Sequence, residues 1–113
     1  MSRLVTMEYI DLMSKLVNRE TSCFAIENAY IANGIVFIKG GVKSGVDFST
    51  AKLLPERYAP YSQQLATVHY TNTSDDNGKV QTLTLQTNGD ITGWVRKLDY
   101  YEPFTFMYPL AIK

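Results

Sequence analysis

Apolar and polar residues alternate with a period of two from residue 23 onward, which is the pattern of half-buried β-strands. The run Phe24–Tyr30 alternates in this way, and Ile35–Lys39 is a dense apolar run that predicts a strand buried on both faces. Asn33 and Gly34 stand between the two runs and predict a type I′ hairpin turn, because both residue types tolerate positive φ. The alternation predicts that one face of the first strand carries Phe24, Ile26, Asn28 and Tyr30.

Three later runs each have one apolar side and one largely polar side, namely Leu65–Tyr70, Val80–Gln86 and Ile91–Arg96. This pattern is typical of an antiparallel sheet that is covered on one face only. Asn88 and Gly89 separate the last two runs and predict a tight turn. The apolar side of the three runs is predicted to be core, and it carries Ala66, Val68, Tyr70, Leu83, Leu85, Ile91, Gly93 and Val95.

The chain closes with another alternating run, Thr105–Ile112, which predicts a final strand. Pro109 has no backbone N–H, so this strand is expected either at a sheet edge or to end its pairing there. The glycines between 40 and 45 predict a loosened loop, followed by a short strand at Val46–Phe48. About seven or eight short strands joined by short turns predict a mainly β fold, a small antiparallel β-sandwich or jelly-roll-like domain.

Residues Val5–Val17 have a helical period instead. A helix of about three turns is too short to be stable alone in water. We therefore expect it to pack on its own domain, or around a symmetry axis with copies of itself. The predicted organisation is an N-terminal helical segment over residues 1–20 and a β-sandwich domain over residues 21–113. The stripe that predicts the helix consists of Met7, Ile10, Met13 and Val17.

The composition narrows the classes of function. A chain of 113 residues supports one domain with a modest core, and its 11 basic residues balance 11 acidic ones. No overall charge attracts nucleic acid, and the charged N-terminus predicts neither a signal peptide nor membrane insertion. Cys23 and His69 are the single cysteine and histidine, so an intrachain disulfide and a zinc or copper site are not expected. We expect no metal and no cofactor.

The sequence offers little for catalysis. Nucleophilic catalysis needs a nucleophile, a base and an orienting group, and no motif of that kind surrounds Cys23 or His69. The carboxylates that could act as a pair, such as Asp75 and Asp90, fall in predicted turns, where acidic residues are usually solvated. The chain is therefore expected not to be an enzyme.

A candidate binding site lies on the non-core side of the second group of strands. Trp94 and Arg96 are two residues apart and project from the same face, and His69 projects from that face on another strand. Asp99 and Tyr100 follow in the next loop. A flat ring beside hydrogen-bonding groups suits a saccharide, which stacks its C–H face on the ring. Two alternatives remain, since Trp94 could pack in a core or subunit interface and His69 could be a satisfied polar group.

A proline-bounded segment, Ala51–Tyr61, separates the two groups of strands. Pro55 and Pro60 exclude a regular helix or a central strand there. The segment is therefore predicted to be a fixed, extended crossover that carries apolar side chains into the core. These side chains are Leu53, Leu54 and Tyr58.

One pattern joins this crossover to the later turn at Asn88 and Gly89, through Ala51, Leu54, Pro55, Tyr58, Pro60, Gly89 and Ile91. The pattern resembles the small C-terminal β domains of bacteriophage tail fibre and baseplate proteins, over roughly Asn28 to Val95. The resemblance implies a virion protein, synthesised in the bacterial cytoplasm and located in the phage tail. It also implies a homotrimer that contacts other tail or baseplate proteins and recognises host cell-wall saccharide. A structural assembly or adaptor protein is the alternative, and a small glycan-active enzyme is a third.

Overall fold

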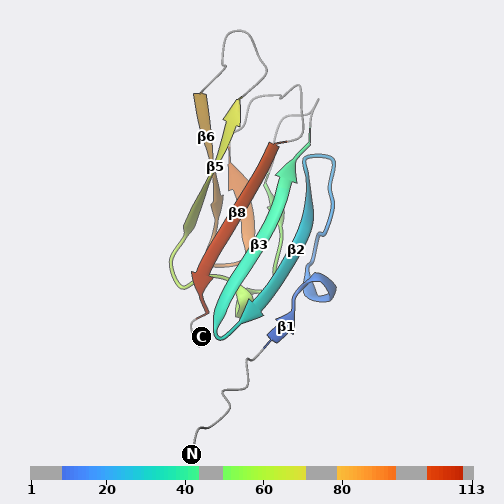
Figure 1. Ribbon diagram of the computed structural model, residues 1–113, viewed down its shortest axis with the longest axis vertical. Helices are drawn as coiled ribbons and strands as arrows, with labels where there is room; N and C mark the ends of the chain where they lie inside the picture. Colours follow the sequence, from blue (N-terminus) through green and yellow to red (C-terminus); the bar gives the residue numbers. More distant parts are fainter. Residues whose placement is uncertain (1–8, 44–49, 71–78, 94–101, 111–113) are drawn as a thin grey trace, which may run out of the picture.

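A computed structural model describes residues 9–43, 50–70, 79–93 and 102–110, which form two four-stranded antiparallel sheets packed face to face (Figure 1). Sheet A has the order β1-β2-β3-β8, with strands Tyr9–Asp11, Phe24–Ala32, Ile35–Val42 and Glu102–Pro109. Sheet B has the order β4-β7-β6-β5, with strands Ala51–Lys52, Asp90–Gly93, Lys79–Leu85 and Gln64–Tyr70. Two short 3₁₀ turns, η1 and η2, occupy Met13–Lys15 and Glu56–Tyr58. The predicted mainly β fold of sandwich type is confirmed.

The core lies between the sheets and is built by alternate side chains of each strand. In sheet B the buried positions are those the alternation predicted, whereas Leu65 and Thr67 face outward. In β8, the ring side chains at every second position are buried in the same way. The core side chains that these strands contribute are Ala66, Val68, Leu83, Leu85, Ile91, Phe104, Phe106 and Tyr108.

A β-bulge in β2 changes which side chains face the core. The register with β3 shifts between Ile26 and Asn28, so one extra residue is inserted and the alternation changes phase. Beyond the bulge Ala29 and Ile31 are buried, whereas Tyr30 lies on the outer face. The predicted single alternation from Phe24 through Tyr30 is therefore wrong from Asn28 onward.

The neighbouring strand β3 also has an open side. Its residues Val36 and Ile38 are fully buried, but Ile35 and Phe37 are only partly covered. The prediction that this strand is buried on both faces is wrong, because no element among the described residues covers the outer side of sheet A. The strand also continues through the two glycines that the sequence assigned to a loop, and ends at Val42.

The crossover carries the two predicted leucines into the core, but it is not extended throughout, because Glu56–Tyr58 forms the 3₁₀ turn η2. Leu53 and Leu54 are completely buried, and both backbone N–H groups donate to the carbonyl oxygen of Gly89, at 2.9 and 3.1 Å. Gly89 has a φ of +96°, a conformation that glycine adopts without strain. The other end of the crossover is held by sheet A, because the Tyr108 hydroxyl donates to the carbonyl oxygen of Tyr58 at 2.7 Å. The crossover therefore ties the two sheets together.

The predicted N-terminal helix is wrong over the described residues. Tyr9–Asp11 forms β1, which pairs with the end of β2, and a single 3₁₀ turn follows. Leu12 is completely buried and its N–H donates to the carbonyl oxygen of Ala29, at 3.0 Å. A helix of three turns is marginally stable in water, whereas pairing with β2 gives this segment its backbone hydrogen bonds within a sheet. The strand predicted at Val46–Phe48 lies outside the described residues.

Strand β8 lies at the edge of sheet A, as Pro109 predicted. The N–H of Leu110 donates to the carbonyl oxygen of Gly34, so even-numbered residues point their N–H groups toward β3 and odd-numbered residues point them away. Pro103 and Pro109 are both odd-numbered. Each proline therefore stands where a missing N–H removes no bond to β3. The hairpin between β2 and β3 also has the predicted geometry, with φ of +51° at Asn33 and +79° at Gly34.

The bond between Tyr108 and Tyr58 leads to a pH prediction. Burial raises the pKa of the Tyr108 phenol well above its ordinary value of 10.0, so the folded state keeps the neutral form. The stability that the buried neutral phenol contributes is fully present below pH 10.0. It is lost as the pH rises from there toward the raised pKa of the folded state. Tyr108→Phe should lower the free energy of unfolding by about 1 kcal/mol at pH 7, the usual net value of a hydrogen bond.

The same variant should also show a shallower loss of stability at alkaline pH. Urea unfolding of the parent and the variant, measured between pH 7 and pH 11, tests both statements. An alkaline decline of equal steepness in the two proteins would contradict the role given to Tyr108.

Candidate functional site

The outer face of sheet A carries a row of large side chains across its strands. The bulge turns Tyr30 outward, and the register places Tyr30 opposite Phe37 and Phe37 opposite Met107. Tyr9 on β1 reaches the same row diagonally. Tyr9 and Met107, at the two ends, are 62% and 61% exposed. The row is therefore exposed at its two ends and half-buried at Tyr30 and Phe37 between them.

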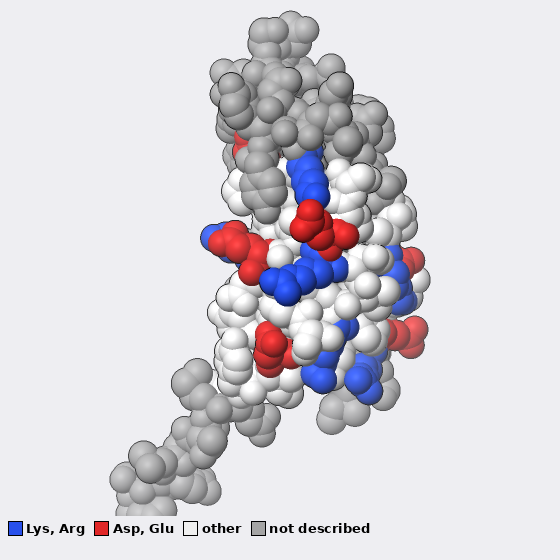
Figure 2. Space-filling view, turned by 90° about the vertical axis from the view of Figure 1, so that its right-hand side faces the viewer, with Lys and Arg blue, Asp and Glu red and all other residues white. Residues whose placement is uncertain are grey.

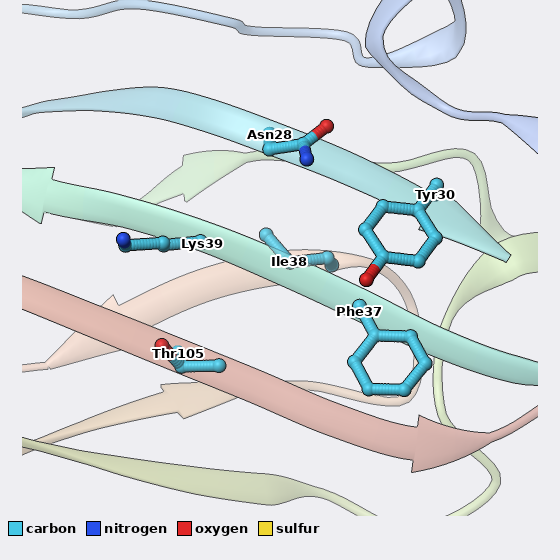
Figure 3. Close-up of a pocket in the computed structure, with 6 residues that line it drawn as sticks. All are labelled: Asn28, Tyr30, Phe37, Ile38, Lys39 and Thr105. Carbon is cyan, nitrogen blue, oxygen red and sulfur yellow. The ribbon is translucent and has the colours of Figure 1, made fainter. Parts of the chain in front are cut away.

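The three rings of the row lie nearly parallel. The ring centroids of Tyr9 and Tyr30 are 5.4 Å apart with an interplanar angle of 21°, and those of Tyr30 and Phe37 are 5.1 Å apart at 20°. At these separations parallel rings are offset, and each leaves part of its face uncovered. Figure 3 shows the rings of Tyr30 and Phe37 side by side, with their faces toward the viewer. The row therefore offers flat apolar surface to a ligand.

A polar row runs beside the aromatic one. Asn28 lies opposite Lys39, and Lys39 lies opposite Thr105, so the three side chains come from β2, β3 and β8. On each strand, the residue of the polar row lies two positions from the residue of the aromatic row, so both side chains project from the same face of sheet A. The two rows share an open hollow of about 180 Å³ (Figure 3). The hollow is lined by Asn28, Tyr30, Phe37, Ile38, Lys39 and Thr105.

The polar row can both donate and accept hydrogen bonds. The amide of Asn28 and the hydroxyl of Thr105 do both, and the ammonium of Lys39 donates. Lys39 Nζ lies 3.8 Å from Glu27 Oε1, and both side chains are more than half exposed. Such a surface ion pair is weak, so the ammonium remains able to bind a ligand. Flat rings beside a few hydrogen-bonding groups suit a ligand with both C–H faces and hydroxyls, as a saccharide has.

The site predicted from the sequence lies elsewhere. His69 belongs to β5 and pairs with Val80, but its side chain is outside the description. Trp94, Arg96, Asp99 and Tyr100 lie outside the described residues. The structure therefore does not describe how these five side chains lie relative to one another, and the site stays a prediction. The face on which it was placed, the outer side of sheet B, is open at Leu65 and Thr67.

Sequence reasoning missed the two rows of sheet A because it missed the bulge. One signal for it was present, since Gly40 interrupts the dense apolar strand. A Cβ at Gly40 would lie 2.6 Å from the carbonyl oxygen of Ala25 and 3.0 Å from Ile26 Cδ1. A glycine inside a strand indicates this kind of close approach or a bulge in the partner strand.

Two other features, a metal-binding cluster and a membrane-spanning helix, are not found among the described residues. Among them, no group of three or more His, Cys, Asp or Glu side chains could hold a metal ion. Over the same part of the chain, no helix is long and apolar enough to cross a membrane. No protein-family model matches the sequence, and a comparison with curated proteins gives no match. Function is therefore inferred from the geometry of the faces that the fold leaves open.

Proposed function

We propose that this chain is a non-enzymatic domain of a bacteriophage tail or baseplate and that it recognises saccharide on the host cell surface. The observation that carries the proposal is the pair of rows on sheet A, with Tyr30 and Phe37 as the flat surface and Asn28, Lys39 and Thr105 as hydrogen-bonding groups. Sugar C–H faces would rest on the rings while hydroxyls bind the polar row.

The contacts of the crossover support the assignment to phage tail proteins. The resemblance rests on two separate stretches of sequence, one with Leu54 and Tyr58 and one with Gly89 and Ile91. In the fold these stretches touch, because the N–H of Leu54 donates to the carbonyl oxygen of Gly89. Leu54 and Ile91 are also both part of the buried core. Residues that match a pattern together and also contact each other support one shared structural motif.

A structural role in virion assembly is the second candidate. Met107 lies next to Phe37 in the aromatic row and is 61% exposed. Tyrosine, phenylalanine and methionine are enriched in protein interfaces, and a polar rim surrounds such interfaces. On this alternative the outer face of sheet A binds another tail or baseplate protein instead of a glycan.

Truncation of Phe37 separates the two candidates. Phe37→Ala removes one ring from the outer face without touching the core, and it should weaken binding of purified bacterial cell-wall polysaccharide about five- to tenfold, the value of one aromatic contact. Isothermal titration and a glycan array measure the effect. Tyr61→Ala is the matched control, because Tyr61 is an aromatic residue that is 76% exposed on the crossover. Unchanged glycan binding by Phe37→Ala, or no glycan binding by the parent, would favour the assembly role.

We also propose that copies of the chain form a closed homotrimer through the outer face of sheet B, which leaves sheet A free for ligand. That face has rows of threonine hydroxyls, with Thr67 opposite Thr82 and Thr84 opposite Thr92. Leu65, which is 63% exposed, extends the second row. Hydroxyls with an exposed leucine suit an interface that retains bridging water.

Leu65→Lys tests this arrangement, since a buried unpaired ammonium opposes association. Light scattering of the parent should give about three times the chain mass of 12.8 kDa, and Leu65→Lys should give the single-chain mass. Met107→Lys, which alters an equally exposed residue of sheet A, should remain trimeric. A parent mass of 12.8 kDa at micromolar concentration would contradict the proposal.

A further inference from the structure

Three aromatic rings are aligned on the outer face of sheet A. Tyr9, Tyr30 and Phe37 come from three successive strands, and the two centroid separations, 5.4 and 5.1 Å, are almost equal. Both values are comparable to the length of one pyranose unit in an extended glycan. The interplanar angles are also almost equal, so the rings form a regular series across the strands.

The two sides of this series differ. On one side lies the polar row, in which Asn28 and Lys39 are opposite each other. On the other side the register places Ala32 opposite Ile35, and Ile35 opposite Pro109, so that side is apolar. A ligand that follows the rings therefore finds hydrogen-bonding groups along one edge only.

The charges of this face nearly cancel. Lys39 is paired with Glu27, and the carboxylate of Asp11 stands opposite Tyr30 at the β1 end of the series. Figure 2 shows an adjoining side of the molecule, the right-hand side of Figure 1, where acidic and basic side chains are also interspersed over the described residues. The described residues beside the rings thus contribute one ammonium and two carboxylates, and this set of charges does not attract an anionic ligand.

From these observations we infer that the site binds a neutral, unbranched oligosaccharide, whose successive sugar units rest on Phe37, Tyr30 and Tyr9. This inference rests on the proposed function and adds the length and charge of the ligand. The chain lies across the strands, and the hydroxyls of one edge bind the polar row. A branch on the opposite edge would meet the apolar side at Ile35 and lose hydration without a compensating bond.

Binding of linear β-1,4-linked glucose and N-acetylglucosamine oligomers, from one to four units long, tests the inference by isothermal titration. Affinity should increase with each unit up to the third and stay level at the fourth. Tyr9→Ala should weaken binding of the three-unit oligomer about five- to tenfold and leave the two-unit affinity unchanged. Tyr9→Leu should behave like Tyr9→Ala, and Tyr9→Phe should retain the parent affinity, because the ring and not the bulk or the hydroxyl supports the third unit.

The control ligands are anionic oligomers of glucuronic acid of matched length, which should bind more weakly than the neutral series. Equal affinities for one and three units, with binding that still depends on Phe37, would overturn the inference and leave the proposed function standing. Tighter binding of the anionic series would overturn it as well. Absence of binding to every glycan would overturn both the inference and the proposed function.

Discussion

One carbonyl group, that of Gly89, connects segments that are far apart in the sequence. It accepts the N–H groups of both Leu53 and Leu54, and so attaches the crossover to the turn between β6 and β7. The carbonyl of Leu53 in turn accepts the N–H of Val17, at 2.8 Å, which attaches the segment after β1. Because both leucines are completely buried, these bonds place two large apolar side chains between the sheets. Closure of the sandwich on this side depends on this arrangement.

Among the described residues nothing covers the outer face of either sheet, and a single inserted residue decides which side chains the outer face of sheet A displays. Without the bulge, the alternation would place Tyr30 toward the core, where Ala29 and Ile31 now pack. With it, Tyr30 joins Phe37 on the outside and Asn28 joins Lys39. The proposed ligand face is thus a consequence of backbone register and not of a loop. Its side chains stand on paired strands, which hold them at fixed separations.

The parts of the fold that could be predicted are those in which a local pattern agrees with the tertiary structure. Sheet B follows uninterrupted alternation, and the crossover follows from two prolines, so Leu54 was placed correctly in the core. The N-terminal helix was wrong because its stripe did not mark the buried side. Ile10 and Val17 are 40% and 52% exposed, whereas Leu12 is completely buried. The rows of sheet A were missed because a bulge changes the phase of β2, and the one sign of it in the sequence, Gly40, lies in the partner strand.

Two glycines that both have positive φ provide the most direct test of whether the fold depends on the contact between the crossover and the turn at Gly89. At Gly89 an added Cβ would overlap the carbonyl of Leu54, whereas at Gly34, with φ of +79°, it would meet nothing within 4 Å. Urea unfolding should therefore show a loss of about 1–2 kcal/mol for Gly34→Ala, the cost of the backbone conformation alone. For Gly89→Ala the loss should be about 3 kcal/mol or more, because the crossover must also move away from the turn. Equal losses in the two variants would contradict the claim that the fold depends on this contact.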